Sequence, residues 1–156
     1  MAISFKSVGK TREQRIANAL NNSPTPIGIV TPLRFGQNTL FAMHYSLADS
    51  VNDNLRNLIL TNWGERLGLY DFGANLRPLL SDYVSQDDFD AKAVERISGA
   101  VAKWMPYVSL ETFESVVDRQ ANASSQGTAV IKLMIVYSIP ALQVLRRGLE
   151  VTLYVM

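Results

Sequence analysis

The sequence contains no cysteine, and this absence excludes several kinds of site at once. Without a thiol the chain can form no disulfide, no thiolate metal site and no cysteine nucleophile. An excess of charge of one sign is also missing, because 15 basic residues stand against 14 acidic residues in a chain of 156. A nucleic-acid-binding domain normally has a clustered basic face, so this balance argues against nucleic acid as a partner. We therefore expect a fold that packing alone stabilises.

Long apolar runs are missing as well. No segment approaches the ~20 apolar residues that a membrane-spanning helix needs, which argues against a membrane partner. The first six residues, Met-Ala-Ile-Ser-Phe-Lys, lack the apolar core of a signal peptide. We therefore expect the protein to be made in the cytoplasm. Its length is typical of one domain.

Glu65 and Asp71 are the two carboxylates that would suit a glycoside hydrolase. Such an enzyme needs two carboxylates across a sugar-binding cleft, and one of them must have a raised pKa. Arg66 and Arg77 are near in the sequence, and a cation close in space lowers the pKa of a carboxylate. We therefore predict that neither carboxylate is catalytic.

Other catalytic and metal sites find little support in the sequence. His44 is the sole histidine, and no Gly-x-Ser-x-Gly turn accompanies it to supply a nucleophile. The acidic residues at 87–90 lack the spacing and the glycine of a calcium loop. We predict no catalytic residue, no metal and no cofactor, and hence a protein that is not an enzyme.

Two amphipathic helices and a short one are predicted in the central part of the chain. The first helix begins after Ser46 and ends near Thr61, and its apolar residues fall on one face. These residues are Leu47, Val51, Leu55, Leu58 and Ile59. A short helix begins at Pro78. The last helix begins after residues 87–88, ends before Pro106 and carries on its buried side Val94, Ile97, Val101 and Trp104.

Beyond Pro106 the apolar period changes from a helical one to two, which predicts strands. We expect strands over residues 107–118, 128–139 and 149–156, with an exposed loop over residues 119–127. In the second strand one face consists of Ile131, Leu133, Ile135, Tyr137 and Ile139. The predicted fold is α+β, with two main helices and short helices packed on a small antiparallel sheet of about three strands. Residues 1–26 form an extended N-terminal arm, and residues 27–156 form a single domain.

The segment between the first two helices, residues 60–77, contains three glycines and a Glu-Arg pair. Gly64 is placed to adopt a positive φ that ends the first helix. Gly73 allows a tight turn, and Phe72 is the apolar residue that would pack this turn onto the core. A purely structural turn with a solvated ion pair explains the same residues, and a binding role can coexist with it.

The pattern of this segment resembles the hallmark of the baseplate wedge proteins of contractile phage tails, a family that has carried a lysozyme-like label. The hallmark reads Thr-x-x-Gly-Glu-Arg, here at residues 61–66, followed by Phe-Gly-x-x-Leu, here at residues 72–76. The family includes the sheath initiators and is related to the small baseplate subunits of type VI secretion systems. On this resemblance, the candidate interaction residues are Gly64, Glu65, Arg66, Phe72, Gly73 and Leu76.

The resemblance implies a structural protein of the virion tail baseplate that reaches the baseplate from the host cytoplasm. Such proteins join a bundle of larger wedge subunits and template the first ring of tail sheath. Hub and tail tube proteins are further candidate partners, and the arm would contact neighbouring baseplate subunits. The family ends its second core helix with Glu-Pro-Arg, whereas this chain has Met105, Pro106 and Tyr107 there. An ionic contact therefore does not carry over, and we expect an apolar and aromatic contact through Met105 and Tyr107.

The last predicted strand offers a second candidate interaction site. A sheet of about three strands has two edges, and an open edge can accept a strand from another chain. The strand residues assigned to this contact with the sheath protein are Val151, Leu153 and Val155. The alternative is that residues 27–45 cover this edge within the chain, and the sequence leaves both interpretations open.

Two alternative functions remain open at this point. One is the corresponding subunit of a type VI secretion baseplate. The other is a small non-enzymatic regulatory adaptor of the same fold, because a fold does not fix a function.

Overall fold

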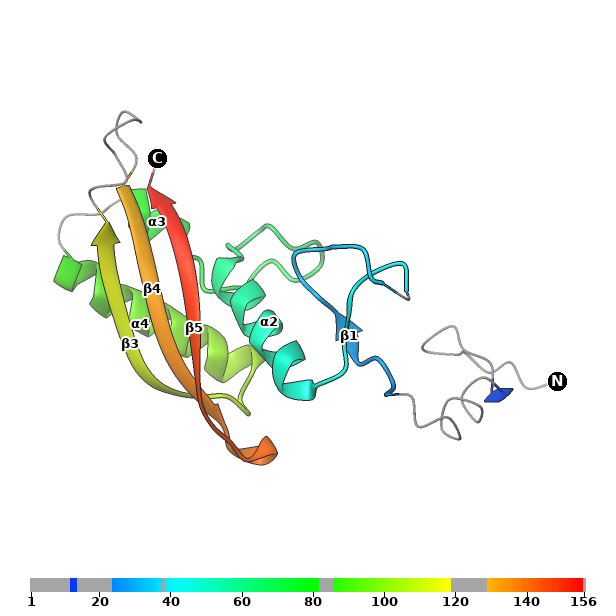
Figure 1. Ribbon diagram of the computed structural model, residues 1–156. Coiled ribbons are helices and arrows are strands. Elements are labelled where there is room, and N and C mark those ends of the chain that lie inside the picture. Colours follow the sequence, from blue (N-terminus) through cyan, green and yellow to red (C-terminus); the bar gives the residue numbers. More distant parts are fainter. Residues whose placement is uncertain (1–11, 14–23, 38, 82–85, 119–128, 156) are drawn as a thin grey trace. The chain divides into compact units, whose positions relative to one another are not determined.

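The computed structural model describes residues 12–13, 24–37, 39–81, 86–118 and 129–155 (Figure 1). The chain divides into two compact units, residues 1–50 and residues 51–156. Most of the predicted N-terminal arm and all of the loop predicted at 119–127 lie outside the described residues, so both stay predictions. None of the described helices is long and apolar enough to cross a membrane.

The first unit contains a two-stranded antiparallel ribbon. Its strands are β1 (Gly28–Ile29) and β2 (Met43–His44), in a register that places Gly28 opposite His44. Backbone hydrogen bonds extend the pairing on both sides, from Ile27 N to His44 O at 2.7 Å and from Val30 N to Ala42 O at 2.9 Å. Among the described residues this ribbon is a sheet of its own and pairs with no strand of the larger sheet.

Three helices match the predicted ones. They are α2 (Leu47–Leu60), α3 (Arg77–Ser81) and α4 (Gln86–Trp104). Two predicted core residues are wrong, because Leu47 is 46% exposed and Val94 is 41% exposed. On α4 the buried side keeps the predicted Ile97 and Val101, but it includes Ala93 and Ala100 and leaves Val94 outside. Its buried residues are Phe89, Ala93, Ile97, Ala100 and Val101.

The second unit carries a three-stranded antiparallel sheet of order β3-β4-β5. Its strands are β3 (Ser109–Asp118), β4 (Ala129–Ile139) and β5 (Val144–Val155). β5 begins five residues earlier than predicted, because only a short 3₁₀ turn at Pro140–Leu142 separates it from β4. With these elements the predicted α+β fold is confirmed.

The core of this unit lies between one face of the sheet and the helices, with α4 running across β3 and β4 (Figure 1). The alternation predicted that every second residue of β4 from 131 to 139 lies on one face. This face is fully buried. Tyr137 spans the core, because its hydroxyl donates a hydrogen bond to Asn52 Oδ1 of α2 at 2.8 Å. This bond ties the central strand to α2.

Candidate functional site

The segment after α2, residues 61–76, leaves the helix and returns to pack against its last turn. The last carbonyls of a helix need partners from beyond it, and this segment supplies two of them. The Thr61 hydroxyl donates to Asn57 O at 2.6 Å, and Ala74 N donates to Leu58 O at 3.0 Å. Gly64 has the predicted positive φ, +85°, but it lies four residues beyond the helix and does not end it. Its N–H instead closes the loop by donating to Tyr70 O at 2.7 Å.

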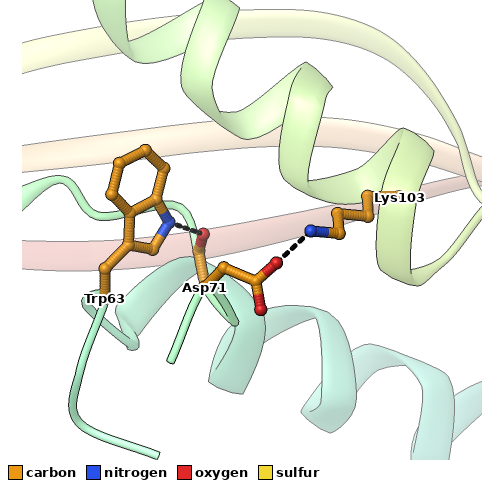
Figure 2. Close-up of polar contacts among 4 residues, drawn as sticks. Trp63, Asp71 and Lys103 are labelled. Carbon is orange, nitrogen blue, oxygen red and sulfur yellow. Dashed lines mark hydrogen bonds and ion pairs between the residues drawn. The ribbon is translucent and has the colours of Figure 1, made fainter. Parts of the chain in front are cut away.

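Gly73 is the point at which the returning chain passes closest to the helix end. Its φ is +111°, and a Cβ atom at this position would lie 2.1 Å from Thr61 O. The Gly73 carbonyl accepts a hydrogen bond from Trp63 Nε1 at 3.1 Å (Figure 2). A side chain here would therefore be strained and would also collide with backbone, so glycine is required.

Glu65 helps to hold the start of the loop. Its carboxylate accepts hydrogen bonds from the Asn62 backbone N–H at 2.8 Å and from Asn62 Nδ2 at 2.9 Å. These bonds from Asn62, with a smaller contribution from the charge of Arg77, lower the pKa of Glu65. Asn62 Oδ1 in turn accepts from Arg77 N at 3.0 Å. Glu65 thus stabilises the turn by hydrogen bonds with Asn62 rather than by an ion pair with Arg66.

A stack of cations and aromatic rings joins the loop to the end of α4. The Arg66 guanidinium lies 4.3 Å from the centroid of the Phe72 ring, and Phe72 meets Trp104 edge to face at 5.3 Å. Lys103 lies over Trp104 and also forms an ion pair with Asp71 (Figure 2). This hydrogen-bonded pair lowers the pKa of Asp71. Phe72 therefore anchors the loop on the core, as the sequence predicted.

The same stack forms part of a groove between α2 and the end of α4, which we call the α2–α4 groove. Its volume is about 560 Å³, and its lining residues are Asn54, Asn57, Thr61, Glu65, Arg66, Phe72, Trp104, Met105 and Tyr107. Five of these are candidate interaction residues from the sequence. Met105 is buried and Tyr107 is 45% exposed. The groove thus unites two candidate segments that α4 separates in the sequence.

The remaining predicted site residues lie elsewhere. Leu76 is buried in the core, and Pro106 is exposed beside the groove residues that flank it in sequence. Val151 and Leu153 of β5 also face the core, so a contact made through β5 would use its main chain. Val155 is the last residue of this strand. Whether these residues bind another protein stays a prediction.

Four groove residues were not among the predicted interaction residues, namely Asn54, Asn57, Thr61 and Trp104. Thr61 is the first residue of the hallmark pattern. Asn54 and Asn57 are spaced like any polar residues on the outer side of an amphipathic helix, and Trp104 was interpreted as a core residue. Only the fold reveals that they share a wall with the loop. Among the described residues, no cluster of three or more histidine or acidic side chains could hold a metal ion.

Replacing Gly73 with alanine is expected to destabilise the protein by about 2 kcal/mol or more, because strain and a backbone collision act together. Gly64→Ala is the matched control. It also has a positive φ, but its Cβ would meet nothing within 4 Å, so its cost should be nearer to about 1 kcal/mol. Urea unfolding of both variants measures the difference. Equal losses would contradict the close approach at Gly73.

Comparisons with known proteins show the fold of the chain. No protein-family model and no curated protein sequence matches it. Among solved structures it is similar to a chain of the anti-feeding prophage baseplate, with a TM-score of 0.58 and 21% identity over 78% of this chain and 90% of that chain. It is also similar to a candidate tail lysozyme from Geobacter sulfurreducens, with a TM-score of 0.52 and 21% identity over 71% of this chain and 93% of that one. The chain therefore shares the fold of these two proteins.

Proposed function

We propose that this protein is a structural subunit of the baseplate of a contractile phage tail, where it joins the wedge and initiates the tail sheath. The fold likeness to the anti-feeding prophage baseplate chain carries the proposal, because the match covers 90% of that chain. The convergence of the hallmark segment and the Met-Pro-Tyr segment on one groove adds support. A type VI secretion baseplate subunit is the nearest alternative, and a regulatory adaptor of this fold is the more distant one.

The α2–α4 groove is the proposed docking site for a larger wedge subunit. Its apolar lining residues, Phe72, Trp104 and Met105, belong to the core or pack against it, and hydrogen bonds hold its loop wall in place. Arg66 and the amides of α2 add donors that can fix the orientation of a partner. Interfaces draw much of their affinity from aromatic and arginine residues around an apolar centre, and this groove has that composition.

Tyr107→Ala tests the docking site. Tyr107 is half exposed at the groove, so its loss should spare the fold while weakening the complex with the larger wedge subunits by about 2 kcal/mol, or roughly 30-fold in Kd. Co-purification and titration with those subunits measure the effect. Tyr154→Ala, at a more exposed tyrosine of β5 outside the groove, is the matched control. Unchanged binding by the Tyr107 variant would reject this docking site.

The edge of β5 is the proposed template for the sheath. Residues 147–155 pair with β4 without a break in register, and no described strand pairs with their other side. β3 is the opposite edge, but it is interrupted by a bulge between Leu110 and Thr112. Bulges protect edges from strand addition, so β5 offers the more regular edge to a strand of the sheath protein.

Hydrogen exchange of the intact protein with purified tail sheath protein tests this edge. Deleting β5 would not test this edge, because its residues 149, 151 and 153 belong to the core and their loss would disrupt the fold. We expect peptides from residues 147–155 to exchange more slowly when the sheath protein is bound, since added strand pairing protects amides. Peptides from β3 are the internal control. Protection of β3 alone would place the sheath on the other edge.

We also propose that the protein is not an enzyme and needs no cofactor. The candidate tail lysozyme raises the question, but glycoside hydrolysis requires a carboxylic acid with a raised pKa. Here the pKa of Glu65 is lowered by hydrogen bonds from Asn62, and the pKa of Asp71 is lowered by Lys103. Neither group is suited to donate a proton at neutral pH.

A peptidoglycan-clearing assay checks this expectation. Wild type and Glu65→Gln should both leave the substrate intact, since the lowered pKa of Glu65 leaves this carboxylate without a proton to donate at neutral pH. Clearing by the wild type that Glu65→Gln abolishes would show instead that Glu65 is catalytic.

A further inference from the structure

Gly99 lies on the exposed side of α4, well inside the helix, and the described part of the chain gives no steric reason for it. A glycine inside a helix lowers helix stability relative to alanine, because it has more backbone freedom to lose. A Cβ atom at Gly99 would meet nothing within 4 Å, in contrast to the collision at Gly73. The loss of helix stability at Gly99 is therefore not explained by a close approach of other atoms within the described part of this protein.

Gly99 lines a second groove, which we call the Gly99 groove. Its volume is about 550 Å³, and α4 forms one wall while the loop after α2 contributes Trp63 and Asp71. Along α4 the groove is lined at helical spacing by Lys92, Arg96, Gly99 and Lys103. The missing side chain at Gly99 thus leaves a notch in a ridge of long side chains.

Internal contacts fix both sides of this notch. Lys103 is paired with Asp71, and Arg96 donates to the carbonyl of Asn75 (Figure 2 shows the first of these). Trp63 is 59% exposed, yet its indole N–H already donates to Gly73 O. The indole ring therefore offers apolar surface without an unsatisfied donor, and the groove keeps its shape without a partner.

We propose that the Gly99 groove receives an α-helix of a larger wedge subunit, which crosses α4 at the notch and inserts an apolar side chain beside Trp63. Helices pack by fitting the ridges of one into the gaps of the other, and a gap at helical spacing suits a second helix. Lys92 forms no ion pair with a described residue and can pair with a carboxylate of the partner helix, while Glu95 of the same groove can pair with a cation of that helix. Trp104 lines this groove and the α2–α4 groove alike, so one partner can cover both.

An internal role for Gly99 is the competing explanation. The neighbouring Ser98 donates its hydroxyl to Val94 O at 2.6 Å, and such back-bonding often accompanies a bend in a helix. If α4 needs Gly99 for a bend, alanine at this position will destabilise the free protein. If the helix does not need it, Gly99→Ala will raise the melting temperature by about 2–4 °C. A lower melting temperature would overturn the inference.

Incorporation into the wedge gives the second test, with Gly99→Gln and the adjacent Ser98→Gln as a matched pair. Both place the same side chain on the exposed surface of α4, but only position 99 fills the notch. After co-expression with the larger wedge subunits, we expect loss of Gly99→Gln from the purified complex and retention of Ser98→Gln. Retention of both variants would overturn the inference.

Because the chain has no cysteine, a single cysteine introduced at one position reports whether that position is covered, and this test remains decisive even if Gly99→Gln fails to fold. In the purified complex Gly99→Cys should lose its reactivity toward a maleimide, whereas Ser98→Cys should keep it. The inference rests on the proposed function, but the two can fail separately. A complex that forms while the thiol at position 99 stays reactive rejects only the Gly99 groove, and a wild-type chain that never joins the wedge rejects both.

Discussion

The site depends on the close return of residues 61–76 to the end of α2. Gly73 passes so near to Thr61 that no side chain fits, and the N–H groups of the next two residues donate to carbonyls at the helix end. This return brings Phe72 onto Trp104 and places Arg66 over Phe72. Since Trp104 lines both grooves, each of them depends on where this one loop lies.

The elements of the fold could be predicted from the sequence because their apolar periods are strong. The alternation along β4 placed every second residue from 131 to 139 on one face, and that face is buried. The exposed Val94 and Leu47 show the limit of this reasoning. A periodic pattern gives the width of a buried stripe, but its edges depend on which elements pack against the helix. The pairing of β1 with β2 was not predicted either, because each strand is only two residues long.

The candidate site could be predicted only in pieces. Glycines and an apolar anchor signal a tight loop, so Gly73 and Phe72 stood out before the fold was known. That Met105 and Tyr107 would meet this loop depends on the packing of α4, which no local pattern encodes. Gly64 was assigned to the wrong role for a similar reason, since the loop geometry and not the helix end requires its positive φ.

The surface beside this loop is where we propose that a baseplate wedge binds. Electron cryomicroscopy of the intact chain co-expressed with the larger wedge subunits and the sheath protein tests that claim most directly. We predict a wedge in which this chain is present, with the α2–α4 groove covered by another subunit and the sheath protein added at β5. A wedge that assembles without this chain, while the chain stays alone in solution, would contradict the claim.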